Sequence, residues 1–149
     1  MDPFTQGAIG AALSQSFAPA EKVKSATLVG ALSGMVPDLD VLIRSSTDPL
    51  LFLDYHRQFT HALLFVPIGA LVCCLAFYPF VRSLTFKQTY FFCLLGYLTH
   101  GLLDACTSYG TMLFWPLSET RIAWNNISVI DPLVTIPLIF CVILAARKR

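Results

Sequence analysis

One long uncharged stretch constrains the fold of this 149-residue chain more than any other feature. Residues 62–81 form a run of twenty residues without a charged side chain. A helix that crosses the hydrocarbon core of a bilayer needs about 20 predominantly apolar residues. Two later runs, 88–103 and 127–146, are apolar apart from a few isolated polar side chains. The sequence therefore predicts transmembrane helices over 62–81, 88–103 and 127–146.

Two shorter apolar segments precede these runs. Residues 3–18 are rich in small side chains. Residues 25–36 end at Pro37, and proline disfavours helix in the residue before it. Both segments are expected to form shorter or partly inserted helices. Gly30 and Gly34 give the second one a face on which another helix can pack closely.

The composition excludes several classes of protein. The chain is 56% hydrophobic and 13% charged, whereas a typical soluble domain is about 45–50% apolar and about 25% charged. Disordered chains are charge-rich, and a formal net charge of +1 offers no basic surface for nucleic acid. The expected fold is an all-α membrane protein, a single compact bundle of about five helices over residues 1–149. Three of these helices would be transmembrane spans, and two would be shorter or partly inserted.

The charged residues predict an orientation, because loops rich in Lys and Arg remain in the cytoplasm. With the C-terminus inside and the helices alternating, seven of the ten basic residues fall on that side: Lys22, Lys24, Arg82, Lys87, Arg147, Lys148 and Arg149. Eight of the nine acids fall on the other: Asp2, Asp38, Asp40, Asp48, Asp54, Asp104, Glu119 and Asp131. We therefore predict a multi-pass membrane protein with a cytoplasmic C-terminus and all its histidines near the outer face.

Two acids follow Pro37 at this outer level. If Pro37 ends the helix, an extended backbone points residues two apart to the same side. Asp38 and Asp40 would then both face one ion. A solvated loop or a pair of acids at a helix end explains the same residues without a ligand.

The motif His56-Arg57-Gln58-Phe59-Thr60-His61 contributes two histidines. A spacing of five residues separates them by about 140° on a helix, so they cannot share one helix face. If Thr60 caps the helix that follows, His56 belongs to the preceding loop and His61 to the first helical turn. The two imidazoles could then approach one ion from two directions. Interfacial histidines near lipid headgroups are the alternative.

His100 and Asp104 form the most specific pair, because a spacing of four places them on one helix face. An acid inside the membrane costs about 2.5–3.5 kcal/mol on the insertion scale, so such residues are usually paired and functional. The pair therefore indicates a site of chemistry. The alternative is a His–Asp contact that joins two helices.

The mixture of imidazole and carboxylate suits zinc, manganese or iron. We predict one or two divalent ions, zinc or manganese, bound by Asp38, Asp40, His56, His61, His100 and Asp104. Such an ion activates water, and two ions can clamp a phosphoester displacement. The catalytic residues would be Asp38, His61 and Asp104.

Further polar residues are candidates for positions around the metal. Arg57 and Arg121 could hold a phosphate, since guanidinium matches its geometry. The other candidates are Gln6, Thr60, Ser108 and Asp131. For Gln6, Ser108 and Asp131 the alternatives are a helix-packing amide, a chain turn and an acid at a helix N-terminus.

In its ordered motifs the chain resembles the LexA-regulated, membrane-bound metal-dependent hydrolases of bacteria, the YdjM-like inner-membrane proteins. The motifs that carry the resemblance are residues 1–6, 37–40, 56–61, 96–100 with 103–104, 107–111, 115–116 and 131–132. The resemblance spans nearly the whole chain and implies an inner-membrane metalloprotein with ligands at the six acidic and histidine positions. Gln6 stands where many members have histidine, and Ala62 where many have serine.

The resulting hypothesis is a membrane-bound, metal-dependent hydrolase. Its substrate would be a phosphoester of a lipid or lipid-linked molecule, attacked by a metal-activated water. A metal-binding or metal-transport protein without hydrolytic activity is the alternative, although the cytoplasmic halves of the expected helices offer no polar path. A third possibility is a structural membrane protein in which His–Asp pairs join helices.

Overall fold

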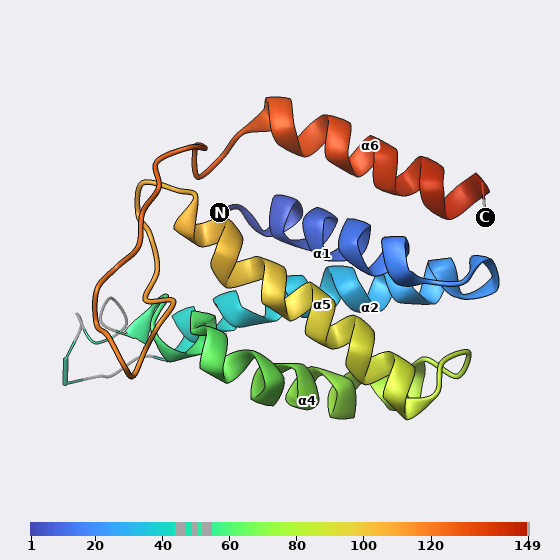
Figure 1. Cartoon of the computed structure of the whole chain (residues 1–149), viewed down its shortest axis with the longest axis horizontal. Coiled ribbons are helices and arrows are strands. Elements are labelled where there is room, and N and C mark those ends of the chain that lie inside the picture. The colour runs from blue at the N-terminus through green and yellow to red at the C-terminus, as the bar shows by residue number, and fades with distance from the viewer. Residues whose placement is uncertain (44–46, 49–50, 52–54, 149) are drawn as a thin grey trace.

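The computed structural model describes the chain except for residues 44–46, 49–50, 52–54 and 149. The described residues form helices and no β-strand (Figure 1). The α-helices are α1 (Pro3–Phe17), α2 (Val23–Met35), α4 (Val66–Phe77), α5 (Phe86–Ala105) and α6 (Pro132–Lys148). The 3₁₀-helices are η1 (Ala20–Lys22), η2 (Val36–Leu42), η3 (Phe59–His61), η4 (Leu63–Phe65) and η5 (Tyr78–Phe80). The all-helical expectation is confirmed for this part of the chain.

Local capping fixes where two of the helices begin. The Asp2 side chain accepts a hydrogen bond from Thr5 N at 3.0 Å, with Pro3 at the first helical position of α1. Thr85 and Gln88 form a reciprocal capping box at the start of α5. Because of this box, α5 begins before residue 88 and runs for 20 residues.

The expected set of three transmembrane spans differs from the structure. One segment expected to be short belongs to a candidate span, and two expected spans do not qualify as candidates. The first 3₁₀-helix after α2 starts at Val36, so Pro37 lies in its first turn, where the missing N–H costs no hydrogen bond. The helical run therefore continues over Ala20–Leu42, whose 23 residues are long and apolar enough to cross a membrane. The segment at 25–36 is thus part of a candidate span and not a short helix.

Leu63–Phe80 is the other candidate span among the described residues, and it agrees with the expectation over 62–81. The remaining two expected spans fall outside this class. Polar side chains along α5, including His100 and Asp104, lower its hydropathy. In α6 the helix begins only at Pro132, so its apolar stretch, Pro132–Arg147, is shorter than a span.

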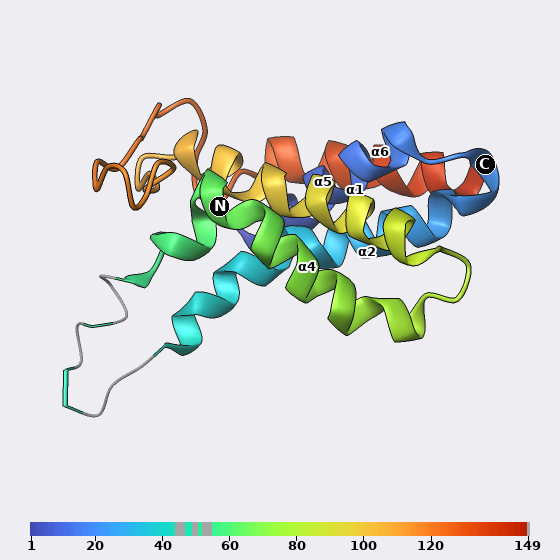
Figure 2. The same ribbon diagram turned by 60° about the horizontal axis from the view of Figure 1, so that its bottom comes forward.

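Glycines bring α1, α2 and α5 into close contact at the centre of the bundle. A Cβ atom on Gly96 would lie 2.3 Å from the carbonyl oxygen of Gly30, and one on Gly10 would lie 2.4 Å from the same oxygen. Real Cβ atoms do not approach so closely, so only glycine allows these helices to meet. Helix α4 packs on α5 and α6 on α1, at opposite sides of this core (Figures 1 and 2). The close packing expected at Gly30 and Gly34 is confirmed.

The bundle has two chemically different ends. The α1–α2 and α4–α5 connections lie with the C-terminus at one end, which carries Lys22, Arg82, Lys87 and Arg147 (Figure 1). The N-terminus and the long connection after α5 lie at the other end, with Asp38 and Asp104 near it. The separation of basic and acidic residues expected from the sequence therefore follows the long axis of the bundle; Asp54 lies outside the described residues.

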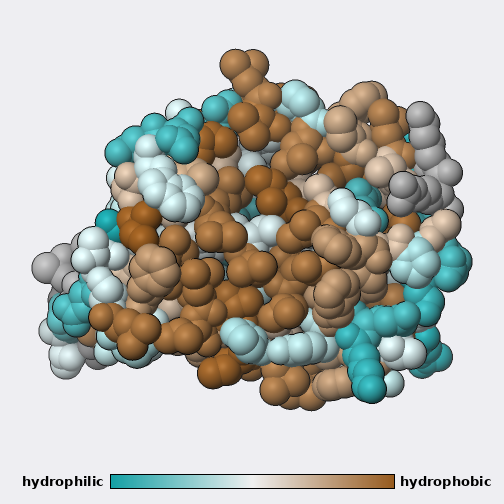
Figure 3. Space-filling view, in the orientation of Figure 1, coloured by the Kyte–Doolittle hydropathy of each residue, from teal (hydrophilic) through white to brown (hydrophobic). Residues whose placement is uncertain are grey.

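Large apolar side chains cover the outside of the bundle between these ends. The exposed ones include Leu64, Ile68, Val72, Ile136 and Phe140. Brown apolar side chains cover most of the face in Figure 3, and hydrophilic side chains gather towards its two ends. Monomeric soluble proteins rarely expose such continuous apolar surface, which is the surface that a bilayer covers.

Candidate metal centre

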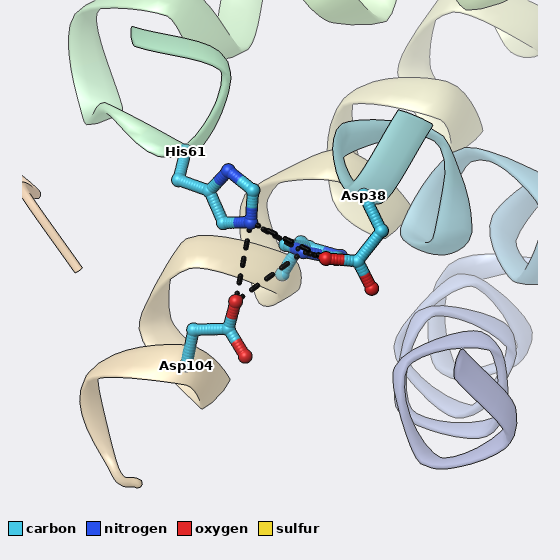
Figure 4. Close-up of side chains that lie close together, drawn as sticks. Asp38, His61 and Asp104 are labelled. Carbon is cyan, nitrogen blue, oxygen red and sulfur yellow. Dashed lines mark hydrogen bonds and ion pairs between the residues drawn. The ribbon is translucent and has the colours of Figure 1, made fainter. Parts of the chain in front are cut away.

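Four side chains from three separate elements converge at the acidic end of the bundle. Asp38 comes from η2, His61 from the end of η3, and His100 and Asp104 from one face of α5 (Figure 4). One donor atom from each lies within 4.8 Å of all the others. The predicted His100–Asp104 pairing is present, with Nε2 and Oδ2 3.5 Å apart.

The distances within this four-residue group, which we call the Asp–His cluster, match the edges of a metal tetrahedron. His61 Nε2 and His100 Nε2 are 2.9 Å apart. Asp38 Oδ1 lies 3.3 Å from His100 Nε2 and 3.6 Å from His61 Nε2, and Asp104 Oδ2 lies 3.2 Å from His61 Nε2. Four ligands about 2.0–2.1 Å from a tetrahedral zinc ion stand about 3.3 Å from one another. Five of the six donor pairs therefore lie near the spacing of a tetrahedral site, and all four donors lie within 4.8 Å of one another.

The hydrogen bonds at the outer ring nitrogens determine which imidazole atoms face the centre. His100 Nδ1 lies 2.5 Å from the carbonyl oxygen of Gly34, which can only accept, so Nδ1 carries the proton. Thr60 Oγ1 donates its one proton to Asp40, so His61 Nδ1 donates to Thr60 at 2.9 Å. The two Nε2 atoms then face each other and two carboxylates, and each can bind a metal ion once it carries no proton. These tautomers are inferred from the hydrogen-bond partners.

Asp104 shows the same excess of acceptors over donors. Its Oδ1 accepts from Gln6 Nε2 at 3.0 Å and forms a buried ion pair with the α-amino group of Met1. Its Oδ2 is buried and has no hydrogen-bond partner among the described residues, although Arg57 Nε lies 3.3 Å away. Buried polar atoms are nearly always satisfied, so this inward-facing oxygen points to a cation.

A proton and a metal ion compete for the centre of the cluster. Burial is the largest influence on the pKa of His61 and lowers it, but hydrogen bonds to Asp104, Asp38 and Asp40 outweigh burial and raise the pKa to about 10. A metal ion that binds at His61 Nε2 therefore displaces a proton near neutral pH, and its apparent affinity increases with pH up to that value.

Asp40 and His56 lie outside the Asp–His cluster, on the far side of His61. The expectation of an extended backbone after Pro37 is wrong: η2 turns Asp38 and Asp40 to different sides. Asp40 Oδ1 accepts from His56 Nδ1 at 2.6 Å, and its Oδ2 accepts from Thr60 Oγ1 at 2.8 Å and from Arg57 N at 3.1 Å. Its Oδ2 is also 3.3 Å from His61 Nδ1. Asp40 is thus a hydrogen-bonded anion that holds His61 in place.

Thr60 also differs from its expected role. It does not cap the following α-helix, because α4 begins only at Val66 and has no side-chain cap. Instead its hydroxyl connects Asp40 with His61. Partners of this kind orient a metal-binding histidine and increase its basicity.

We expect Asp40→Asn to weaken metal binding by about tenfold, the lower end of the 10–100-fold range for such partners. An amide retains the shape but cannot accept on both sides, so the protonated Nδ1 of His61 loses its support. Metal titration of the purified variant measures this change. Asp2→Asn is the matched control, because asparagine also caps a helix and should leave affinity unchanged. Equal metal affinity in both variants would show that Asp40 does not contribute to metal binding.

The two arginines are held by the surrounding loops. Arg57 is 5% exposed, has φ 62°, and donates to Thr107 Oγ1 at 3.2 Å. Its guanidinium carbon lies 4.7 Å above the ring of Tyr109, and that of Arg121 lies 5.2 Å from the same ring. Arg121 donates to the carbonyl oxygen of His56 at 3.1 Å. The structure thus places Arg57 against Asp104, and Arg121 beside His56.

The remaining predicted residues lie at different distances from the cluster. Gln6 is fully buried and contacts it through Asp104, while its Oε1 has no partner among the described residues. Ser108 is exposed and, with Asp131, lines a polar cavity of about 330 Å³ formed by the loops. Asp131 Oδ1 accepts from Leu133 N at 3.1 Å, as an acid at the start of α6 would.

Two residues at the site were not predicted from the sequence. The Gly34 carbonyl fixes the tautomer of His100, and Gly101 allows the backbone of His61 to lie against α5. A Cβ atom on Gly101 would lie 2.3 Å from the His61 carbonyl oxygen. The only hint in the sequence was that Gly101 directly follows His100. The need for glycine there depends on the contact with His61, which is distant in the sequence.

Comparison with known proteins places the whole chain in one family. The model of a family described as YdjM inner membrane protein matches residues 1–149. The chain belongs to the YdjM inner membrane protein family. The resemblance expected from the motifs is therefore confirmed, and YdjM membership agrees with the two apolar candidate spans in supporting a membrane location. No curated protein and no solved structure gave a match.

Proposed function

We propose that this YdjM-family chain is a metal-dependent hydrolase that binds one divalent ion at the Asp–His cluster. The observation that carries the proposal is the meeting of two imidazole Nε2 atoms, 2.9 Å apart, beside two carboxylate oxygens, with all four donor atoms within 4.8 Å of one another. Zinc or manganese suits this mixed donor set. Asp40 and His56 are bonded to each other, so the described geometry supports one ion.

The chain's own residues would prepare this site for hydrolysis. A divalent ion held there would lower the pKa of a bound water towards about 7 and polarise an oxygen of the substrate. Asp40 and the Gly34 carbonyl hold the two imidazoles in the tautomers that offer Nε2. Gln6 donates to Asp104 and Arg57 lies beside it, so both hold its carboxylate in place. Asp38, the one partly exposed member, forms the side of the cluster that a substrate would approach.

Four protein ligands would fill a tetrahedral ion, whereas catalytic zinc sites retain an open position. A fifth position, or the release of Asp38, would admit the water. Asp38 suits this role because its side chain is 21% exposed, whereas the side chains of His61, His100 and Asp104 are 0% exposed.

We further propose a phosphoester of a lipid or lipid-linked molecule as the substrate. The cluster lies at one end of the bundle, and apolar side chains cover the surface between the two ends, so lipid headgroups would lie near the cluster. Arg57 is buried against Asp104, whereas Arg121 is partly exposed and lies beside His56, so we propose Arg121 for the phosphate. The proposed orientation has this end at the outer face and the C-terminus in the cytoplasm, because the opposite end carries the basic residues.

The alternative of metal transport finds no support in the packing. Between the cluster and the basic end, the core consists of apolar or small side chains, including Val29, Ala70, Phe92 and Cys93. Ion conduction needs polar groups along the whole path. Among the described residues, the buried charged side chains lie only at the acidic end, and the buried hydroxyls of Ser14, Ser33 and Thr89 donate to backbone carbonyls of the bundle.

The experiment is metal analysis and a hydrolysis assay on the protein purified from membranes. We expect one zinc or manganese ion per chain and hydrolysis of p-nitrophenyl phosphate or phosphatidate. A chelator should abolish this activity and added metal should restore it. Protein without bound metal, or with activity that a chelator does not change, would contradict the proposal.

A further inference from the structure

The burial of the four ligands leaves one direction of approach to the Asp–His cluster. Three of the four side chains are inaccessible to solvent, and Asp38 alone is partly exposed. Any molecule that reaches the centre must therefore pass the outer side of Asp38. The structure of that side decides which molecules can do so.

A cavity of about 470 Å³ opens beside Asp38. Three polar residues line it: Asp38, His56 and Arg57. Its remaining described lining is apolar: Met1, Pro3, Met35, Leu39 and Val41. The volume lies within the roughly 300–1,000 Å³ of small-molecule sites, and a mostly apolar lining with a few polar groups is their usual composition. The cavity thus combines a mostly apolar lining with a few polar side chains, one of which, Asp38, belongs to the cluster.

The apolar wall of this cavity belongs to an element that can span the membrane. Leu39 and Val41 lie in η2, within the candidate span Ala20–Leu42. Leu39 is 57% exposed and Leu42 is 69% exposed, so the outer surface of η2 is apolar where the cavity opens. A molecule dissolved in the bilayer can reach this opening without crossing water. A small polar phosphate would gain nothing from the apolar wall.

We propose that this cavity binds one hydrocarbon chain of a membrane amphiphile with an anionic head, and that Leu39 helps to select for the chain. The proposal rests on the proposed function, because it is the metal-loaded cluster that would attract the anionic head past Asp38. Leu39 acts as a specificity-determining residue. It lines this cavity on one side of η2 and a second apolar cavity of about 240 Å³ on the other.

Leu39 and Leu42 provide a matched pair of variants. Both are exposed leucines of η2, three residues apart, but Leu42 lines neither cavity. Leu39→Trp should fill part of the cavity, while Leu42→Trp adds the same bulk outside it. Neither leucine is one of the four ligands, so both variants should bind metal as the wild type does.

The test uses zinc-loaded protein in phosphatidylcholine nanodiscs with a trace of hexadecyl phosphate that carries a diazirine in its chain. Illumination should label the segment containing Met35 and Val41, as located by mass spectrometry. Excess hexadecyl phosphate should suppress this labelling, and methyl phosphate should not. Leu39→Trp should weaken the competition by about tenfold, the affinity carried by roughly two methylene groups. Leu42→Trp should behave as wild type, and the smaller Leu39→Phe should fall between.

Two results would overturn the cavity proposal. One is labelling of this segment that hexadecyl phosphate does not suppress, which would indicate general contact with lipid. The other is equal competition in folded Leu39→Phe, Leu39→Trp and Leu42→Trp. If competition follows the prediction but the wild type hydrolyses no phosphoester, the cavity proposal stands and the hydrolase proposal fails. If the wild type hydrolyses a phosphoester but the competition does not follow the prediction, the hydrolase proposal stands and the cavity proposal fails.

Discussion

The His100→Ala/Asp104→Ala double variant is expected to contain no bound zinc or manganese and to have no hydrolytic activity. It removes two of the four donors, including the oxygen that lies 3.2 Å from His61 Nε2. Two remaining donors on separate segments cannot hold the ion against water. Elemental analysis of the purified protein and the phosphoester assay measure the two losses together.

Folding must be separated from binding in this experiment. Removing Asp104 leaves Arg57 without its buried partner, and breaking a buried ion pair costs about 3–5 kcal/mol. Asp104→Asn is therefore the second variant, because it keeps the volume and the acceptor for Gln6 while removing the charge. Asp131→Asn, a change at the start of α6, is the control that should retain metal.

The same variants distinguish a metal site from a structural His–Asp contact. If the pair only joins helices, the wild type contains no metal and the double variant loses its helical circular dichroism or its gel-filtration peak. Full metal occupancy in a folded double variant would show instead that the ion binds elsewhere. Only loss of metal from a folded Asp104→Asn protein agrees with the proposed centre.

The parts of the site that depend on local geometry could be predicted from the sequence. His100 and Asp104 are four residues apart in a helix begun by the Thr85 capping box, so their shared face follows from helix periodicity alone. The apolar run at 62–81 likewise needs no tertiary information. Both expectations depend only on residues that are close in the sequence, and both agree with the structure.

The roles of Asp38 and Asp40 could not be predicted in this way. They depend on whether the backbone after Pro37 is extended or helical, and proline is compatible with both an extended chain and a first helical turn. The 3₁₀-helix η2 sends Asp38 to the ligands and Asp40 to the opposite nitrogen of His61. The backbone conformation after Pro37 therefore separates the two acids: Asp38 lies in the proposed metal site, and Asp40 contacts His61 from the other side.

Gly101→Ala is expected to damage the site although Gly101 offers no functional group. The new Cβ atom would lie 2.3 Å from the carbonyl oxygen of His61, which is backbone and cannot move aside like a flexible side chain. Overpacking of this kind destabilises a fold by about 1–3 kcal/mol. Here it would also push His61 away from His100, and a displacement of about 1 Å at a catalytic group can cost about 100-fold in rate.

Gly7→Ala is the matched control for this substitution, because its Cβ atom would lie 3.1 Å from the sulfur of the flexible Met35 side chain and at an ordinary contact distance, 3.5 Å, from the carbonyl oxygen of Ala31. Thermal unfolding should therefore change little in Gly7→Ala and clearly in Gly101→Ala. Metal titration should show weaker binding only in Gly101→Ala. If Gly101→Ala keeps wild-type metal affinity and activity, then η3 can move on α5 without loss, and the close contact between His61 and α5 does not hold the ligands in register.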